Sequence, residues 1–541
     1  MNLRSVFLSV AGALAAPALA LAQAGAPPAP AQAPSAGQCA SARPLGNPLE
    51  GAVWNGWGVD ATNSRFQNAK AAGLRAQDIP RLKLKWAFGF PNANSAFAQP
   101  TLGAGRVFVG SQTGSVYSLD AATGCTYWTY AAGAAVRTAP SIAATKAAPS
   151  GYALFFGDIR SNVHAVDAAS GQRVWMERVE THQAARVTGA PTLAGDRLVV
   201  NVSSLEEGPG GNVKYECCTF RGSIVVLDVN TGKQFWKTYT IPQEPRPTKK
   251  NKEGVTQWGP AGAAVWSSPT VDVARGIIYV ATGNAYSEPA ADTTDAVLAL
   301  DLKTGKVLWS KQVTPNDVFV VGCGGANATA VNCADDVGPD FDFGNSPILR
   351  TLPGGRQILV IGQKSGVAYG MDPAKQGEII WQVRLGKGTA LGGFEWGSAA
   401  DDQLAYFPLS DVLRPPAEQG GLWALRLATG EQVWHTPSPP VTCAAPRGCN
   451  PAQSAAITVI PGAVFSGAQN GYLRAYSTAD GKILWEFNTW QDFKTVNGVP
   501  AKGGSINGPG PTIAGGLVFT NSGYGQFGGV AGNVLLAFGV E

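Results

Sequence analysis

Charged residues are scarce in this sequence, where Asp, Glu, Lys and Arg together make up 14% of 541 residues. The one basic run that stands out is Lys249-Lys250-Asn251-Lys252, and no aromatic residues alternate with it. Proteins that bind nucleic acid present a basic stripe or patch. We therefore interpret this run as a solvated loop and expect no nucleic-acid partner.

Cysteine motifs for zinc or haem are missing as well. None of the eight cysteines forms a Cys-x-x-Cys pair, and no Cys-x-x-Cys-His motif is present, so the sequence predicts no tetrahedral zinc site and no c-type haem. Eight cysteines instead fit an oxidising compartment, where disulfides form. The spacing allows Cys39/Cys125, Cys323/Cys333 and Cys443/Cys449, and leaves Cys217 next to Cys218.

No hydrophobic run is long enough for a firm membrane anchor. The apolar run at 6–21 follows Arg4 and ends in the small residues Ala20, Ala22 and Ala24, which is typical of a cleavable signal peptide. No cysteine follows directly to accept a lipid. We expect a signal peptide at 1–24, an Ala/Pro-rich linker at 25–45, and export to the periplasm without a stable membrane anchor.

The sequence does contain a repeat, in which an apolar segment is followed by Asp, a Thr-Gly or Ser-Gly pair and Trp. The Trp follows the Asp by eight residues in four copies: Asp120/Trp128, Asp167/Trp175, Asp228/Trp236 and Asp301/Trp309. Weaker copies end at Trp381, Trp434 and Trp485. Each copy predicts a β-hairpin whose turn is made by Asp and Gly.

With Trp86, the repeat tryptophans number eight and lie 42 to 73 residues apart, enough for a four-stranded blade and its loops. We predict an all-β, eight-bladed β-propeller over residues 46–541. The strand around Trp86 lacks a preceding hairpin partner, and segment 533–538 lacks a following one, so pairing the two would close the ring and remove free sheet edges. A seven-bladed ring is the alternative.

The segment from Trp266 to Asn284 carries the first candidate functional residues. Its β-branched stretches at 271–273 and 276–281 predict two paired strands with a turn between them. An indole can stack on a flat cofactor, and a carboxamide oxygen can bind a cation. A core tryptophan and a turn asparagine are the alternative reading of the same pattern.

Further candidates lie in the long insertions between the third and sixth repeat tryptophans, because loops on a rigid scaffold commonly carry function. The carboxylate of Glu206 or Glu207 is a hard oxygen ligand suited to Ca²⁺. Cys217-Cys218, if oxidised, could pack on one face of a planar molecule. Arg221 and Lys364 could neutralise its carboxylate or carbonyl oxygens, and a buried aspartate could act as a general base.

These motifs together resemble those of the pyrroloquinoline quinone (PQQ)-dependent alcohol dehydrogenases, and most closely the polyvinyl alcohol dehydrogenases. The resemblance covers nearly all of the chain after the linker. It is carried by the repeats and by WNGWGVDATNSRFQ (54–67), SSLEE (203–207), CCTFRG (217–222), AVWSSPTVD (264–272), ATGN (281–284), GPDFDFGNSP (338–347), GGFEWG (392–397) and NSGYG (521–525).

The resemblance implies a role in cofactor or metal binding for several of these residues. Trp266 is implied to stack beneath PQQ, with Thr188 as a hydroxyl contact and the cysteine pair and Arg221 as further cofactor contacts. Glu206 and Asn284 are implied to bind Ca²⁺. Glu207 replaces Glu206 if the alignment shifts by one residue.

Catalytic roles are implied for an aspartate and a lysine. Asp340 is implied to be the base and a further metal ligand, with Asp342 as the alternative, because the DFDFG segment can be aligned either way. Lys364 is implied to hydrogen-bond the reactive quinone carbonyl.

The activity implied is oxidation of secondary alcohol groups, those of polyvinyl alcohol in particular, to ketones, with electrons passed to a soluble cytochrome c. A rim of Phe394, Trp396, Tyr524 and Phe527 would suit a polymer or a bulky small molecule. The alternatives are a PQQ enzyme acting on another secondary alcohol or a sugar, and a non-enzymatic propeller that resembles the scaffold of outer-membrane assembly.

Overall fold

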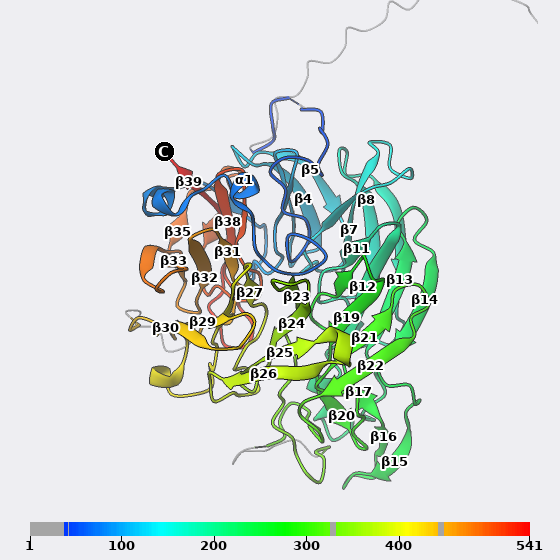
Figure 1. The fold of residues 1–541 in the computed structure, drawn as a ribbon. Coiled ribbons are helices and arrows are strands. Elements are labelled where there is room, and N and C mark those ends of the chain that lie inside the picture. Colours follow the sequence, from blue (N-terminus) through cyan, green and yellow to red (C-terminus); the bar gives the residue numbers. More distant parts are fainter. Residues whose placement is uncertain (1–36, 42, 325–331, 442–447) are drawn as a thin grey trace, which may run out of the picture. The chain divides into compact units, whose positions relative to one another are not determined.

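Eight antiparallel β-sheets follow one another around a ring in the computed structural model, which describes residues 37–41, 43–324, 332–441 and 448–541. The chain colour in Figure 1 runs once around this ring. The predicted signal peptide, part of the predicted linker and Cys443 lie outside the described residues. No helix among the described residues is long and apolar enough to cross a membrane.

Each sheet is one blade of the propeller, and consecutive strands pair antiparallel. Blade 1 comprises β2 (Thr101–Gly103), β3 (Arg106–Gly110), β4 (Ser115–Asp120) and β5 (Thr126–Ala131), and blade 2 comprises β6 (Ser141–Ala144), β7 (Tyr152–Gly157), β8 (Asn162–Asp167) and β9 (Arg173–Arg178). Blade 3 comprises β11 (Thr192–Ala194), β12 (Arg197–Ser204), β13 (Ser223–Asp228) and β14 (Gln234–Tyr239), with β10 (Ala185–Arg186) added to β12. Blade 4 comprises β18 (Thr270–Asp272), β19 (Ile277–Ala281), β21 (Ala296–Asp301) and β22 (Val307–Gln312).

The remaining blades follow the same order. Blade 5 comprises β23 (Ile348–Thr351), β24 (Gln357–Gly362), β25 (Val367–Asp372) and β26 (Glu378–Arg384), and blade 6 comprises β27 (Ala399–Ala400), β28 (Leu404–Pro408), β29 (Leu422–Arg426) and β30 (Gln432–Thr436). Blade 7 comprises β31 (Thr458–Ile460), β32 (Ala463–Gly467), β33 (Tyr472–Ser477) and β34 (Ile483–Asn488). Blade 8 comprises β37 (Thr512–Ala514), β38 (Leu517–Ser522), β39 (Val534–Val540) and β1 (Leu82–Gly89).

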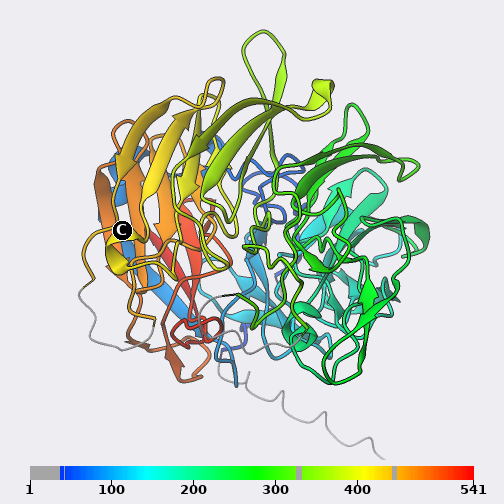
Figure 2. The same ribbon diagram turned by 90° about the horizontal axis from the view of Figure 1, so that it is seen from below.

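The ring closes where β1 pairs antiparallel with β39, with Trp86 opposite Ala537 and Leu82 opposite Val540. Figure 2 shows the red and blue ends of the chain side by side in this blade. The predicted closure and the eight-bladed ring are confirmed. Because the first and last repeats pair in this way, the ring has no open sheet edge between them. A row of separate hairpins would leave such edges exposed.

The repeat residues join neighbouring blades. The indole N–H of Trp128 donates to the carbonyl of Ala168 (3.2 Å), and that of Trp175 donates to Val229 (3.1 Å), in each pair directly after the repeat aspartate of the next blade. The aspartates shape these turns, since Asp120 Oδ1 accepts from two backbone N–H groups of its own turn. Trp485 completes the circle by donating to Leu82 of the closing blade (3.2 Å).

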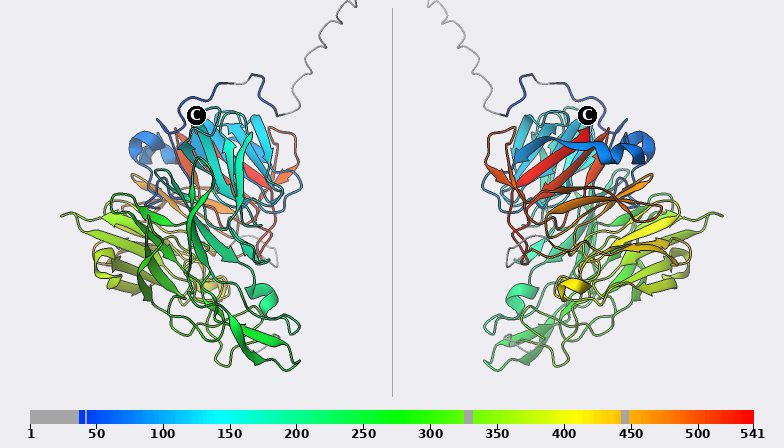
Figure 3. Two further views of the ribbon diagram at one scale, coloured as in Figure 1. Left: turned by 90° about the vertical axis from the view of Figure 1, so that its right-hand side faces the viewer. Right: turned by 90° about the vertical axis from the view of Figure 1, so that its left-hand side faces the viewer.

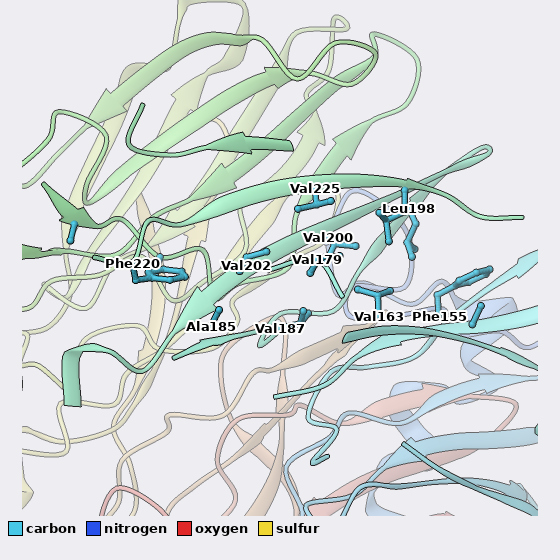
Figure 4. Close-up of a cluster of buried hydrophobic side chains, with 14 of the residues drawn as sticks. Phe155, Val163, Val179, Ala185, Val187, Leu198, Val200, Val202, Phe220 and Val225 are labelled. Carbon is cyan, nitrogen blue, oxygen red and sulfur yellow. The ribbon is translucent and has the colours of Figure 1, made fainter. Parts of the chain in front are cut away.

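The hydrophobic core is divided among the interfaces between blades. Figure 4 shows one such cluster, in which Phe155 and Val163 of blade 2 face Leu198 and Val200 of blade 3. Phe220 extends the cluster beyond the strands and into an insertion. The strands are therefore rigid supports for the loops at their ends.

Long insertions extend from one side of the ring. They include α2 (Glu207–Gly210) after β12 and the hairpin of β15 (Arg246–Lys250) and β16 (Thr256–Gly259), which project from the same side in Figure 3. Smaller additions are α1 (Ala69–Ala72), β17 (Ala261–Gly262) paired with β20 (Ala285–Ser287), β35 (Asp492–Phe493) paired with β36 (Ala501–Lys502), and 3₁₀ turns at Ala76–Arg81, Pro373–Lys375 and Pro416–Glu418.

Disulfides join Cys39 to Cys125, Cys323 to Cys333 and Cys217 to Cys218. The first two pairings are as predicted. The third shows the adjacent cysteines in the oxidised form.

Candidate active site

A pocket of about 700 Å³ opens among the insertions and is lined by five of the predicted residues: Thr188, Trp266, Asn284, Asp340 and Lys364. Thr188 and Trp266 precede the first strand of blades 3 and 4, whereas Asn284 and Lys364 follow the second strand of blades 4 and 5. The first two strands of a blade run antiparallel, so the residues before the first strand and those after the second strand lie at the same end of the blade. The propeller therefore brings these side chains together.

Trp266 is held by contacts along its ring edges. Its indole N–H donates to Asp342 Oδ2 (3.2 Å), and its ring meets Trp396 edge to face with centroids 5.1 Å apart. Gly344 lies against the benzene edge of the indole, where a Cβ would come within 2.0 Å of Trp266 Cη2. These contacts orient the indole as a flat wall of the pocket, suited to stacking on an aromatic molecule.

Both carboxylate oxygens of Asp342 are occupied by this scaffold. Oδ1 accepts from the backbone N–H of Asn284 (2.7 Å), and Oδ2 accepts from both Trp266 and Lys364 Nζ (3.0 Å). Gly283 makes room for it, because a Cβ there would lie 2.5 Å from Oδ1. Asp342 thus has the contacts of a positioning residue.

Asp340 differs from Asp342 in having one oxygen left free. Its Oδ1 accepts from Lys364 Nζ (2.9 Å), and Oδ2 receives no hydrogen bond from the described residues. Its backbone has φ = 60°, a left-handed conformation uncommon outside glycine. Asp317 supports this conformation by accepting from the backbone N–H groups of Asp340 (3.0 Å) and Phe341 (2.6 Å).

The pocket holds more acidic than basic groups around Lys364. Burial raises the pKa of Asp340 well above its usual range, and the neighbouring charges of Glu207 and Asp342 add to this while Lys364 opposes it. Burial alone would lower the pKa of Lys364, but Asp340 and Asp342 hold it well above its usual range. Burial also raises the pKa of Glu395, to about 7. Lys364 therefore stays charged among carboxyl groups that are costly to ionise.

Glu206 and Glu207 point into different surroundings. Glu206 is fully buried and accepts from Tyr215 Oη (3.0 Å) and from the backbone N–H groups of Thr219 (3.0 Å) and Phe220 (2.8 Å), and it does not line the pocket. Glu207 lines the pocket, and its buried Oε1 has no hydrogen-bond partner in the part of the chain that the structure describes. Burial and then the charge of Asp342 raise the pKa of Glu207 to about 8.

An oxygen-only cation site fits the side chains of this pocket. The amide nitrogen of Asn284 donates to the carbonyls of Ala285 and Phe319 (both 2.9 Å), so its Oδ1 remains as the free acceptor. Glu207 Oε1 and Asp340 Oδ2 lack partners among the described residues. Although the described residues contain no cluster of three or more His, Cys, Asp or Glu arranged to hold a metal, two carboxylates and an amide oxygen suit a hard cation such as Ca²⁺.

Two predicted cofactor contacts lie away from the pocket lining. The Cys217–Cys218 disulfide is buried behind α2, where a Cβ on Gly210 would come within 3.1 Å of Cys217 Sγ. Arg221 donates to the carbonyls of Ile241 (3.2 Å) and Pro242 (3.1 Å) and stacks over Tyr239. In this structure both support the insertion rather than line the pocket.

The cationic side chains that do line the pocket, besides Lys364, are Arg137 and Arg186, and the sequence reasoning missed both. Within the described ranges, neither arginine forms an ion pair and the buried Arg186 Nε has no hydrogen-bond partner. Burial and then the charge of Arg137 lower the pKa of Arg186 to about 10. Spacing could have revealed Arg137, since it precedes Pro140 by three residues, as Trp266 precedes Pro269.

The predicted aromatic rim is only partly present. Phe394 is fully buried against Phe407, with ring centroids 5.3 Å apart, and Tyr524 is fully buried in the pocket wall. Phe527 is the member that is widely exposed, at 54%.

Comparison with known proteins identifies the family. A model of the β-propeller domain of glucose/ethanol/alcohol dehydrogenases matches residues 54–321, and a model of the outer membrane protein assembly factor BamB matches residues 220–531. A polyvinylalcohol dehydrogenase from Pseudomonas sp. is 46% identical over 499 residues, which cover 90% of this chain and 77% of that protein. This chain belongs to the polyvinyl alcohol dehydrogenase family.

A second relative agrees with this assignment, and a solved structure agrees with the fold. The polyvinylalcohol dehydrogenase of Sphingopyxis sp. (strain 113P3) is 44% identical, covering 90% of this chain and 76% of that protein. The solved structure of the quinohaemoprotein alcohol dehydrogenase ADHIIG from Pseudomonas putida HK5 shares the fold with a TM-score of 0.69, at 18% identity over 94% of this chain and 83% of that one. The chain is an enzyme of the PQQ-dependent alcohol dehydrogenase type, and the scaffold alternative is not needed.

Proposed function

We propose that this protein oxidises secondary alcohol groups, those of polyvinyl alcohol in particular, to ketones in the periplasm, with PQQ and Ca²⁺ in the pocket and a soluble cytochrome c as the electron acceptor. The observation that carries the proposal is the pocket itself, where Trp266, Asn284, Asp340 and Lys364 converge beside Glu207. The disulfides Cys39–Cys125, Cys217–Cys218 and Cys323–Cys333 support an oxidising compartment.

The residues divide into those that hold the cofactors and those that act on the substrate. Glu207, Asn284 and Asp340 are proposed as Ca²⁺ ligands, with Glu207 replacing Glu206 because Glu206 is satisfied by hydrogen bonds away from the pocket. Trp266 is proposed to stack on the PQQ ring, with Thr188 at its edge. When bound, PQQ accepts the two electrons of the oxidation, and Ca²⁺ makes its carbonyl more electrophilic.

Two arginines line the pocket, whereas the predicted cofactor contact Arg221 does not. PQQ carries carboxylates, and Arg137 and Arg186 are lining cations that form no ion pair among the described residues. We propose that they bind these carboxylates, in place of Arg221 and the disulfide, which lie outside the pocket.

Asp340 is proposed as the base rather than Asp342. Its Oδ2 is free to accept the hydroxyl proton of the alcohol, whereas both oxygens of Asp342 hold Trp266, Lys364 and Asn284 in place. A divalent cation beside Glu207 would favour the ionised form of Asp340 and so prepare it as a base. Lys364 Nζ lies between the two aspartates, where it can hydrogen-bond an oxygen on which negative charge develops.

The test is dye-linked oxidation of polyvinyl alcohol and of 2-propanol by the purified protein, with and without added PQQ and Ca²⁺. Activity should require both additions and should fall at least tenfold in Asn284→Ala. Glu207→Gln and Glu206→Gln form a matched pair, and only the first should raise the Ca²⁺ concentration needed for half-maximal activity. Absence of activity together with absence of any PQQ-induced thermal stabilisation would refute the proposed function.

A further inference from the structure

Large apolar side chains are exposed at eleven of the described positions, and most of these are ordinary. Five occur singly, one on the last strand of each of five blades: Met176, Phe235, Leu308, Val433 and Ile483. Scattered single apolar residues on a surface need no functional explanation.

Three of the remaining side chains line the same pocket. Leu205, Val321 and Phe527 are 46%, 56% and 54% exposed, and all three line the pocket. They come from separate insertions, after β12, between β22 and β23, and between β38 and β39. We call these three residues the apolar collar, and their exposure on the lining of a single pocket sets them apart from the scattered ones.

The backbone fixes the collar in place. The N–H of Val321 donates to the carbonyl of Glu207 (3.1 Å), and the carbonyl of Leu205 accepts from Gly208 (3.1 Å), so both residues are tied to the turn that carries Glu207. Phe527 has φ = 49°, a conformation rare for a bulky side chain. Its loop is closed by a hydrogen bond from Tyr524 N–H to the Val530 carbonyl (2.8 Å). A strained, exposed phenylalanine at a pocket indicates a binding role.

We propose that the apolar collar binds the hydrocarbon segments on either side of the oxidised carbinol, and so determines how kcat/KM depends on the length of the alcohol. This inference rests on the proposed function. A carbinol must reach Asp340 inside a pocket of about 700 Å³ that also has to hold the cofactor. A substrate with more than a few carbon atoms therefore extends through the opening, where the collar can remove its methylene groups from water.

The size of the effect follows from the hydrophobic effect. Full burial of one methylene group corresponds to about a fourfold gain in binding, and contact on an open collar should yield roughly twofold. The value of kcat/KM should thus rise by about that factor for each added methylene, until the chain is longer than the collar.

The experiment measures dye-linked kcat/KM for 2-propanol, 2-butanol, 2-hexanol, 4-heptanol and oligomers of vinyl alcohol with the PQQ- and Ca²⁺-loaded enzyme. The variants are Val321→Thr, which keeps the side-chain shape, and the triple variant Leu205→Ser, Val321→Thr, Phe527→Ser. Val273→Thr is the matched control, because Val273 is 57% exposed but lies in the turn between β18 and β19, at the opposite end of blade 4 from Trp266 and Asn284.

The wild-type enzyme and Val273→Thr should show the same gain per methylene, and the triple variant should lose most of it. A wild-type enzyme indifferent to chain length, or a triple variant that keeps the wild-type gain, would overturn the inference while leaving the proposed function intact. A triple variant that is impaired only with cytochrome c as acceptor would overturn it too, and would assign the collar to acceptor docking. Failure of the loaded wild-type enzyme to oxidise any alcohol would instead refute the proposed function.

Discussion

Replacing each of two adjacent glutamates by glutamine should change stability in opposite directions. Burial and neighbouring charge raise the pKa of Glu207 to about 8, from an ordinary value of 4.5. Burial opposes ionisation of Glu206 as well, but hydrogen bonds from His182 and from the backbone of Thr219 and Phe220 outweigh it and lower the pKa of Glu206. One carboxyl group resists ionisation in the folded state and the other favours it.

The sign of each pH dependence follows from linkage. Because the folded-state pKa of Glu207 is raised, its contribution to the free energy of unfolding is fully present below pH 4.5 and is lost as pH rises from 4.5 to 8. At pH 7 the loss is at most about 3 kcal/mol, since one pKa unit corresponds to about 1.36 kcal/mol. The charges that face Glu207 are those of Asp342, Lys364, Asp317 and Asp340.

The assay is thermal unfolding in EDTA at pH 5, 7 and 8.5, repeated with saturating Ca²⁺. Glu207→Gln should melt higher than wild type in EDTA at pH 8.5, with little difference at pH 5, and should lose the stabilisation by Ca²⁺, which is about 2.7 kcal/mol at one hundred times Kd. Glu206→Gln should melt lower at pH 7, because it weakens hydrogen bonds to a charged acceptor worth about 1.5–3 kcal/mol each. The Glu206 carboxylate contributes stability that is present above pH 4.5 and is lost only as pH falls through its lowered folded-state pKa, so the deficit of Glu206→Gln should be nearly as large at pH 5 as at pH 7. A Glu207→Gln variant that is destabilised at pH 8.5, or that keeps the wild-type response to Ca²⁺, would refute this reasoning.

Three further predictions concern the pocket. Gly344→Ala should weaken PQQ binding at least tenfold, because the new methyl group displaces Trp266; titration of tryptophan fluorescence with PQQ measures this, and unchanged affinity would contradict it. Asp340→Asn should lower kcat by about 10²- to 10⁴-fold with PQQ affinity nearly unchanged, whereas Asp342→Asn should mainly raise the Kd for PQQ; the reverse pattern would exchange their roles. Reduction of the Cys217–Cys218 disulfide should lower the melting temperature more than it changes PQQ affinity, because the disulfide is buried behind α2, and a large loss of affinity would place it at the cofactor.

The repeat residues explain why the fold could be predicted from the sequence. Asp120 shapes its own turn through contacts two and three residues along the chain, and Trp128 docks on the corresponding turn of the next blade. Such interactions recur with every repeat, so a spacing of eight residues indicates both the hairpin and the blade contact. Ring closure could be predicted because the repeat pattern left one strand at each end of the propeller without a partner, and these two strands, β1 and β39, pair in the structure.

The sequence by itself determined the all-β ring and the family motifs. It named Trp266 and Asn284 from the predicted strand pair that joins them, and the roles of Asp340 and Lys364 from the family resemblance that the motifs carry. Only the tertiary structure decided which of two neighbouring residues faces the pocket. Glu206 and Glu207 differ by one position, and the direction of each side chain depends on how α2 packs against distant segments such as Thr219 and Phe220. The exposure of the apolar collar could likewise not be predicted from the sequence. Leu205, Val321 and Phe527 belong to three separate insertions, and only the folded ring places all three on the lining of one pocket.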